Sequence, residues 1–494
     1  MRTTASAATL ICIVAGQCAA ETIAKPADTP SLFPRAVSGD GFLSIPVDGV
    51  KQPYSQVSRR QRAEKSVDVT LENLRTFYSI EVGLGTPPQS VTVLVDTGSS
   101  ELWVNPDCAH ARSPALTKQC QSFGRYDPSR SKTPPIGPFG GESIQYGDVS
   151  DPLTVTSVNV RYFLDNVSFG GAQIKNQTFG VVVSSQGQAQ GILGLAPDVH
   201  GGFNGTLPYS LLLNTMAEQG LISSRAFSLD LRHFDSQTGA IIYGGLDRSK
   251  FIGYLTRRPL VTGIQGETRL AVNVDSVGLT NQASTASFAL APEDAGFILD
   301  SGTTLSRMHS AVAAPILDAL GAQDGGDGIF FVPCRMRNIQ GSVDFAFGNT
   351  TIRVPLSDFI FADDIAGDTD YCPVGMVMTT DQQILGDTVL RAGYFVFDWD
   401  NREVHLAQAA DCGDQDVVVI GSGAGAVPAV QGNCNADGSP RVTKTPSATQ
   451  KPSATGNPAA GKNAGARPEA SLMWVGVSTI VASAMGIWLS QLGW

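Results

Sequence analysis

One pattern that occurs twice constrains the fold of this chain most: an apolar run that ends in Asp and continues with a hydroxyl residue and Gly. Residues 92–100 read TVLVDTGSS and residues 297–304 read FILDSGTT. A carboxylate at the end of a buried strand is costly unless it is hydrogen-bonded or used. An apolar–Leu–Gly unit follows each copy, GILGLAP at 191–197 and ILGDTVL at 384–390. The repetition predicts two similar lobes and a pair of carboxylates.

The stretch between these units has the texture of a β protein. Short apolar or alternating runs, separated by Gly, Pro, Asn and Asp, fill residues 66–412 and predict an all-β domain. We expect an N-terminal lobe over about 66–245 and a C-terminal lobe over about 246–412. Helical periodicity is confined to two segments, which begin at Tyr209 and at His309 and are each followed by Gly.

The N-terminal region is typical of a secreted precursor. Residues 1–20 have a basic start, a short apolar stretch and small residues at the end, which predicts a signal peptide. Residues 21–65 are rich in Pro and Ser and end near the paired Arg59 and Arg60. We interpret them as a removable pro-segment; the alternative is a solvated charge cluster in a loop.

The C-terminal region is typical of an anchored protein. Residues 413–471 are dominated by small and hydroxyl residues and predict a glycosylated stalk. The apolar tail 472–494 follows a polar spacer and small residues, which favours a glycosylphosphatidylinositol (GPI) signal over a retained membrane span. Asn463 is the preferred attachment residue, with Gly461 next. The predicted location is the cell surface, at the outer leaflet of the plasma membrane or the cell wall.

Cysteines and sequons fit the same route. Six cysteines remain after the signal peptide, and we expect disulfides between neighbours in the chain. No His/Cys cluster suggests a metal, and the net charge of −11 argues against a nucleic-acid partner. The six cysteines are Cys108, Cys120, Cys334, Cys372, Cys412 and Cys434, and the glycosylation sequons are at Asn166, Asn176, Asn204 and Asn349.

Two carboxylates brought together by equivalent loops can perform acid–base chemistry. Because two adjacent like charges cannot both ionise easily, the pair shares one proton and titrates as a unit. The aspartic proteases are the best-known example of such a pair. One carboxylate takes a proton from water while the other hydrogen-bonds the carbonyl under attack. A glycosidase would place its two carboxylates on unrelated loops.

Residues of about 74–410 resemble the pepsin family of aspartic endopeptidases. The most specific stretch is YSIEVGLGTPPQSVTVLVDTGSSELWV, from Tyr78 to Val104, followed by FILDSGTT and by ILGDTVLRAGYFVFDWDNREVHLA, from Ile384 to Ala407. The resemblance implies a two-lobed pepsin-like double β-barrel with the active site between the lobes. It also implies a zymogen that hydrolyses polypeptides at acidic pH without a metal or cofactor. We expect a monomer.

Site residues follow from the resemblance position by position. Asp96 and Asp300 match the catalytic aspartates, and Tyr146 with Gly147 matches the flap that closes over substrate. Trp103 matches the tryptophan that supports this tyrosine; ordinary core aromatics are the alternative for both rings. The residues that match the supporting parts of the two loops are Thr97, Gly98, Ser99, Ser301, Gly302 and Thr303.

The flap departs from the family pattern. Val149 stands where a second glycine is expected, and extra residues precede Asp165. The signal peptide, stalk and tail resemble the yapsin-like branch of fungal aspartic proteases, which often prefer basic residues at the cleavage site. Such a preference would require cleft acids such as Glu101, Asp148 and Asp151, and the sequence leaves it open.

Two non-enzymatic alternatives concern the same features. A catalytically impaired pepsin-like protein could serve as a binding or inhibitor protein at the cell surface. Such proteins usually lose an aspartate or its hydroxyl neighbour, and both copies of the motif are intact here. An adhesive wall protein would carry repeats or low-complexity tracts in its main domain, which the sequence lacks.

Overall fold

The structure is a computed structural model that describes residues 37–39, 42–44, 66–73, 78–133, 135–147, 155–197, 210–232, 238–262, 268–325, 328–361 and 371–441. The first three strands, β1 (Val37–Gly39), β2 (Phe42–Ser44) and β3 (Ser66–Asn73), are described by their backbone alone. The expected signal peptide, most of the pro-segment, Asn204, Asn463 and the apolar tail lie outside the described residues.

Six strands of the N-terminal lobe form a closed ring. Their order is β4-β5-β10-β6-β9-β8, and the pairing of β8 with β4 closes it. A closed barrel has no open sheet edge, so all of these strands are paired on both sides. The bounds are β4 (Tyr78–Leu84), β5 (Gln89–Asp96), β6 (Leu102–Val104), β8 (Thr156–Phe169), β9 (Ala172–Gln186) and β10 (Gly191–Gly194).

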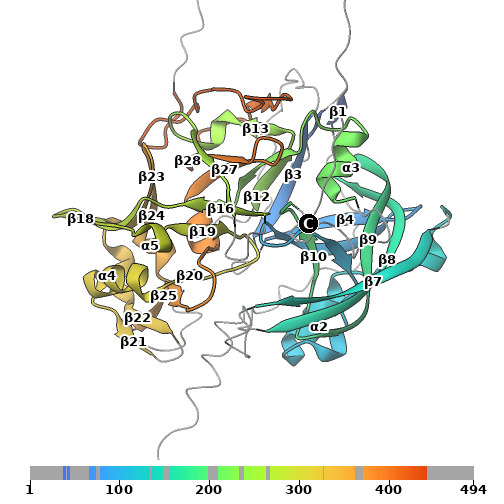
Figure 1. The fold of residues 1–494 in the computed structure, drawn as a ribbon, viewed down its shortest axis with the longest axis horizontal. Helices are drawn as coiled ribbons and strands as arrows, with labels where there is room; N and C mark the ends of the chain where they lie inside the picture. The colour runs from blue at the N-terminus through green and yellow to red at the C-terminus, as the bar shows by residue number, and fades with distance from the viewer. Residues whose placement is uncertain are drawn as a thin grey trace, which may run out of the picture. The chain divides into compact units, whose positions relative to one another are not determined.

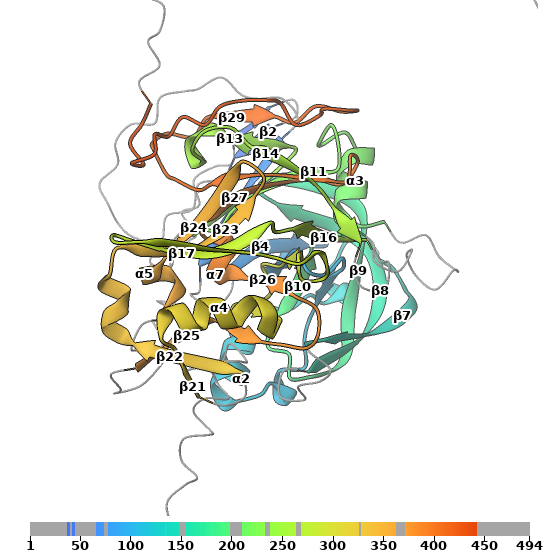
Figure 2. The same cartoon turned by 60° about the vertical axis from the view of Figure 1, so that its left-hand side comes forward.

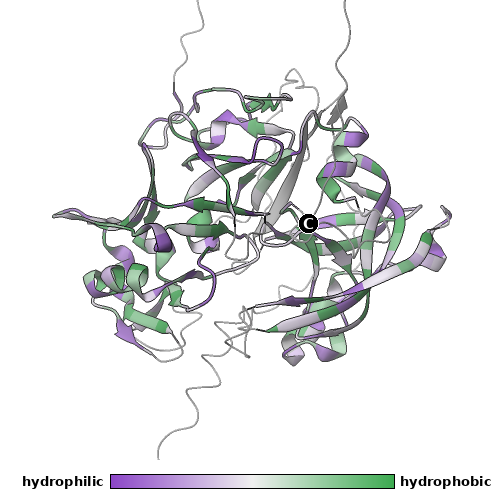
Figure 3. Cartoon of the chain, in the orientation of Figure 1, coloured by the Kyte–Doolittle hydropathy of each residue, from purple (hydrophilic) through white to green (hydrophobic). Residues whose placement is uncertain are grey.

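The strand β7 (Ile136–Tyr146) lies on the outside of this ring and pairs only with β8 among the described strands. Most of its residues are exposed or half-buried, and hydrophilic and hydrophobic residues alternate along β7, β8 and β9 in Figure 3. The alternation is that of strands with one solvated face. The ladder of β7 and β8 ends at the pair Tyr146 and Thr156.

A further run of strands, β14-β28-β27-β11-β12-β3, continues the same sheet from β4 (Figure 1). Its side chains alternate between two cores: Phe395 and Phe397 join the main core, whereas Tyr394 and Val396 join a smaller one. The bounds are β11 (Ala226–Asp230), β12 (Thr238–Tyr243), β14 (Thr256–Pro259), β27 (Gly393–Asp398) and β28 (Glu403–Gln408).

The C-terminal lobe contains two more sheets that bury side chains in the main core. The order of the first is β15-β16-β19-β26-β20-β25-β22-β21, and that of the second is β18-β17-β23-β24. The bounds are β15 (Val261–Thr262), β16 (Thr268–Asn273), β17 (Ser276–Asn281), β18 (Thr285–Ala289), β19 (Gly296–Leu299), β20 (Ser306–Met308), β21 (Gln323–Asp324), β22 (Ile329–Pro333), β23 (Gly341–Phe347), β24 (Thr350–Pro355), β25 (Tyr371–Met378) and β26 (Ile384–Leu385).

Both predicted helical segments are helices. They form α3 (Leu212–Glu218) and α4 (Ser310–Leu320), and α4 ends at Gly321 in the left-handed conformation that favours glycine. A third helix, α2 (Pro114–Ser122), was not predicted, although Ser113 caps it by accepting the Leu116 N–H and proline occupies its first turn. Two one-turn helices, α5 (Leu356–Phe359) and α7 (Asp387–Leu390), lie in the C-terminal lobe.

The expected disulfides between neighbouring cysteines are confirmed in the structure. Each brings its two Cα atoms to between 4.8 and 5.6 Å, within the usual range for a disulfide. The pairs are Cys108–Cys120, Cys334–Cys372 and Cys412–Cys434.

The expected start of the stalk at residue 413 is wrong. Residues 413–441 fold back onto the lobes, and we call this segment the C-terminal strap. Its strand β29 (Val417–Val419) pairs with β13 (Gly245–Asp247), as Figure 2 shows. Ile420 is fully buried in the smaller core beside Tyr394. The composition of this segment predicted an unfolded stalk because it contains few apolar residues. Those residues are concentrated where the strap covers the face of the central sheet that carries Tyr394 and Val396.

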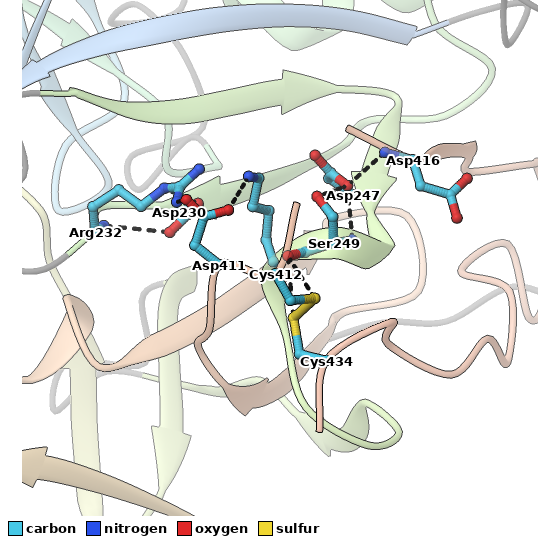
Figure 4. A network of polar contacts seen from close by, with 9 residues as sticks. Asp230, Arg232, Asp247, Ser249, Asp411, Cys412, Asp416 and Cys434 are labelled. Atoms are coloured by element: carbon cyan, nitrogen blue, oxygen red, sulfur yellow. Dashed lines mark hydrogen bonds and ion pairs between the residues drawn. A yellow bond between two sulfur atoms is a disulfide. The ribbon is translucent and has the colours of Figure 1, made fainter. Parts of the chain in front are cut away.

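Ionic and polar contacts hold the chain just before the strap and near its start (Figure 4). Lys250 donates to Asp411 across 2.6 Å, and Arg232 joins Asp411 to the buried Asp230. Asp247 accepts the amide of Asp416 at 2.9 Å. Burial raises the pKa of Asp230. Burial acts in the same direction on Asp411, but contacts from Lys250 and Arg232 outweigh it and lower the pKa of that carboxyl.

We predict that Ile420→Ala lowers the free energy of unfolding by about 2–5 kcal/mol, as expected for truncating a fully buried Ile. Urea denaturation of the secreted protein measures the change. Val417→Ala, at a half-buried position of the same strap, is the matched control and should cost clearly less. Wild-type stability for Ile420→Ala would contradict the packing of the strap.

Candidate active site

Asp96 and Asp300 lie at the ends of two equivalent strands. Asp96 is the last residue of β5, and Gly194 of the parallel strand β10 lies opposite it. Asp300 directly follows β19, which pairs in parallel with β26. The two apolar–Leu–Gly units noticed in the sequence are therefore the neighbours of the two aspartate strands. The carbonyl of Asp96 accepts the Leu195 amide at 2.8 Å, and the amide of Asp300 donates to the Leu385 carbonyl at 3.1 Å.

Each carboxylate has the same two local hydrogen-bond donors: the amide of the glycine two positions later and the hydroxyl three positions later. These contacts favour the ionised form and fix the plane of each carboxylate. The donors to Asp96 are Gly98 N at 2.8 Å and Ser99 Oγ at 2.5 Å, and those to Asp300 are Gly302 N at 2.8 Å and Thr303 Oγ1 at 2.7 Å.

The glycines of the two loops allow the carboxylates to approach. A Cβ atom placed on Gly98 would lie 2.6 Å from the carboxyl carbon of Asp300. A Cβ atom placed on Gly302 would lie 2.5 Å from an oxygen of Asp96. Because each glycine packs against the aspartate of the opposite loop, any side chain at either position would separate the pair.

Thr97 and Ser301 join the two loops directly. The Thr97 amide donates to Ser301 Oγ at 3.2 Å, and the Ser301 amide donates to Thr97 Oγ1 at 2.9 Å. Each hydroxyl then donates across to a strand of the other lobe, Thr97 to the Leu299 carbonyl at 2.8 Å and Ser301 to the Val95 carbonyl at 2.9 Å. Both residues are completely buried, so these contacts are protected from water.

The electrostatics of the site raise the pKa of one of its two carboxyls. Burial first, and then the neighbouring charge of Asp300, raise the pKa of Asp96 well above its usual range. Hydrogen bonds from Ser99 and Gly98 act in the opposite direction. Asp96 therefore keeps its proton to a higher pH than an ordinary aspartate does.

Tyr146 and Trp103 are brought together as expected. The indole N–H of Trp103, which is fully buried in β6, donates to Tyr146 Oη at 2.7 Å. Their ring centroids are 6.2 Å apart. Burial, with the charge of Asp96, raises the pKa of Tyr146, so this tyrosine keeps its hydroxyl proton. Residues 148–154, which include the altered flap tip and the acids Asp148 and Asp151, lie outside the described residues.

A second buried acid lies behind the Asp300 loop and was not singled out from the sequence. The amide of Asp387 donates to the Thr303 carbonyl at 2.8 Å, and its carboxyl lies 3.9 Å from the guanidinium of Arg391. Arg391 also donates to Tyr78 Oη at 2.7 Å. The sequence feature that could have revealed Asp387 is an acid inside the apolar motif ILGDTVL, at the position where GILGLAP has Leu195. Burial raises the pKa of Asp387.

Other predicted sites fall at separate places. Asn176 and Asn349 are exposed, whereas the amide nitrogen of Asn166 donates to Thr86 Oγ1 at 3.1 Å. Glu101 follows the first aspartate loop and accepts a hydrogen bond from Tyr162 Oη at 2.7 Å.

Over the part of the chain that the structure describes, no cluster of three or more metal-binding side chains is found. None of the described helices is long and apolar enough to cross a membrane.

Two equivalent strand–loop units that hold a carboxyl pair across two β lobes define an aspartic-dyad hydrolase. The sequence profile of the family described as Eukaryotic aspartyl protease matches residues 77–409, so the chain belongs to that family. It is an aspartic-type endopeptidase.

Curated relatives and a solved structure agree with this assignment. Candidapepsin of Candida tropicalis is 32% identical over 77% of this chain and 91% of its own length. Secreted aspartic protease 3 of Candida albicans is 33% identical over 77% and 92%. The probable aspartic-type endopeptidase opsB of Aspergillus oryzae is 31% identical over 78% and 80%. The crystal structure of an aspartic proteinase from Irpex lacteus shares the fold, with a TM-score of 0.55 at 22% identity over 70% of this chain and 98% of that chain.

We predict that Asp96→Asn stabilises the protein at neutral pH and not at acidic pH. A raised pKa means that the folded state holds a proton that the unfolded chain releases, so this stability is present below the unfolded pKa of ~3.9 and is lost as pH rises. Asparagine has no proton to lose. Thermal unfolding should show a higher Tm for the variant at pH 7 and a smaller difference at about pH 3.5. Asp318→Asn, at an exposed position of α4, is the control; an equal Asp96→Asn effect at both pH values would refute the shift.

We also predict that Thr97→Val lowers the free energy of unfolding by about 1–3 kcal/mol, because the Ser301 amide and the Leu299 carbonyl lose a buried partner. Thr97→Ser keeps the hydroxyl and should cost much less. If Thr97→Ser destabilises the protein in urea as much as Thr97→Val does, packing of the threonine methyl group matters as much as the crossed hydrogen bonds, and the prediction is wrong.

Proposed function

We propose that this protein is a secreted, cell-surface aspartic endopeptidase in which Asp96 and Asp300 activate one water molecule for attack on a peptide bond. The crossed contacts between Thr97 and Ser301 carry this proposal, because they hold two carboxyls face to face within a buried site. Such a pair is suited to peptide hydrolysis, which needs a base and an acid at the same carbonyl.

The proposed mechanism uses the shared proton. The ionised carboxyl removes a proton from water as its oxygen attacks the peptide carbonyl, and the protonated carboxyl donates to the carbonyl oxygen. The tetrahedral intermediate then breaks its C–N bond as the leaving nitrogen takes the proton that the first carboxyl received from water, and a hydroxyl of the intermediate returns its proton to the second carboxylate, which restores the pair. Tyr146, held by Trp103, would lie over the bound peptide and exclude water from the reacting bond.

The carboxyl pair favours catalytic activity at acidic pH. A carboxyl pair that shares a proton loses its acid when both groups ionise. Asp96, Asp230 and Asp387 are buried carboxyls with raised pKa values, so the folded state also loses stability as pH rises. Both effects point to activity in acid, with a decline towards neutral pH.

We further propose a zymogen that is processed near Arg59 and Arg60, glycosylated, and tethered through a GPI anchor at Asn463. The support is the order of signal peptide, pro-segment, protease domain, stalk and apolar tail, which resembles the yapsin-like branch. The stalk follows the folded strap and begins near residue 442. Exposed Asn176 and Asn349 are the favoured glycan sites among the described residues.

A preference for basic residues is the substrate class that the same resemblance suggests. Glu101 is the described acid that supports it, since Glu101 directly follows the first aspartate loop and its charge acts on Tyr146. The contact from Tyr162 orients the Glu101 carboxylate beside the flap strand.

We predict that Asp300→Asn lowers kcat/KM by about a thousandfold or more, since one carboxyl of the acid–base pair is removed. The test uses the matured secreted protein and a mixed peptide library between about pH 3 and 7. Pepstatin should abolish the wild-type activity, and Asp318→Asn should retain it. A folded, glycosylated wild-type protein that is inert at every pH would reject the enzyme and favour a binding role.

A further inference from the structure

The C-terminal strap encloses the segment through which the chain passes from one lobe to the other. This connection consists of β13 and a single 3-10 turn, Arg248–Lys250, and lies between β12 and β14. Both arms of the strap reach Arg248. The Arg248 amide donates to the Asp416 carbonyl at 3.0 Å, and the Arg248 carbonyl accepts the Asn433 amide at 2.7 Å. The backbone of the connection is therefore bonded on both sides by residues far away in sequence.

The side chain of Arg248 contacts the same two arms. Its Nε donates to the Gln431 carbonyl at 2.9 Å, and its Nη1 lies 3.4 Å from the Asp416 carboxylate. That carboxylate also accepts a hydrogen bond from the side-chain amide of Asn433 at 2.7 Å, which joins the two arms to each other. Because one residue is held through its amide, its carbonyl and its guanidinium, the connection has little freedom to bend at this point.

A disulfide and an apolar contact complete this enclosure. Cys412, directly before the strap, is bonded to Cys434 near its end, and the Cys412 amide donates to the Ser249 carbonyl at 3.1 Å (Figure 4). Apolar residues of the strap pack on the face of the sheet where β11 of the N-terminal lobe pairs with β27 of the C-terminal lobe. The family profile ends at residue 409, so the strap lies outside the part of the chain that the profile matches.

We infer that the C-terminal strap is a clamp that fixes the spacing of the two lobes, so that both are in place to bind an extended peptide. The inference rests on the proposed peptidase activity. Thr97 and Ser301 hold the aspartate pair by their own contacts, so the clamp acts on substrate contacts farther from the cleaved bond. An extended peptide advances about 3.3 Å per residue, so about eight residues span about 26 Å and reach both lobes. A fixed spacing lowers the entropic cost of binding such a peptide.

The test compares a peptide of about eight residues with one of about four residues that has the same cleaved bond. Arg248→Gln removes the guanidinium contacts to both arms of the strap and leaves the backbone bonds in place. On the long peptide this variant should raise KM by about three- to tenfold with kcat near wild type, as expected when a contact that preorganises a site is lost. The short peptide makes few contacts away from the aspartate pair, so its KM should change by less than about twofold.

Hydrogen exchange measured by mass spectrometry reports on the clamp without any catalysis. The amides of Arg248 and Asn433, which are bonded between the connection and the strap, should exchange faster in Arg248→Gln than in wild type. Arg248→Lys keeps the charge without the planar fork and should give intermediate values in both measurements. Arg257→Gln removes an exposed arginine of β14 that pairs with Glu403 within the C-terminal lobe, and this matched control should behave as wild type.

Three results would overturn the inference. Unchanged exchange in Arg248→Gln would show that this side chain does not hold the strap on the connection. A wild-type KM for the long peptide, despite faster exchange, would show that the strap does not act on substrate binding. An equal change on both peptides would place the effect at the aspartate pair. If the wild-type protein cleaves no peptide, the proposed function is rejected, whereas the exchange measurement still decides whether the strap clamps the connection.

Discussion

Two buried hydroxyl groups, those of Thr97 and Ser301, hold two like-charged carboxyls against each other, and the rest of the site depends on that contact. Each hydroxyl accepts an amide from the opposite loop and donates to a carbonyl of the opposite lobe. Asp96 and Asp300 repel each other when both ionise, so the loops would separate without a link that does not itself titrate. Neutral hydroxyl–amide contacts provide such a link at every pH.

The symmetry of the site is broken where chemistry requires different environments. The residue after the Gly of the apolar–Leu–Gly unit is Leu195 in one half and Asp387 in the other. The side chains differ: one is a fully buried leucine, and the other is a buried acid beside Arg391. A buried pair of this kind is weak support for stability, but removing one partner leaves an uncompensated charge.

The C-terminal strap gives the central sheet its second core. The family profile ends at residue 409, whereas the folded chain continues to 441. Alternation along β27 leaves Tyr394 and Val396 on the face away from the main core, and Ile420 packs there. The strap also reaches the connection between the lobes through Asp416, whose amide donates to Asp247 and whose carboxylate pairs with Arg248. The lobes are thus joined both at the aspartate loops and along the outer face of the sheet.

The sequence by itself determined the local units: the β texture, two of the helices, the order of the cysteines and the repeated motif that predicted the pair Asp96 and Asp300. Strand alternation and helix ends depend on near neighbours, although α2 was missed because its signals are few and the helix is short. Only the tertiary structure decided what meets across the chain. The strap was misread because its burial depends on a sheet face formed by strands far away in sequence. A sequence specifies which side chains can hydrogen-bond or ionise, but the packing of the lobes sets the distances, and distance decides which of those groups act on one another.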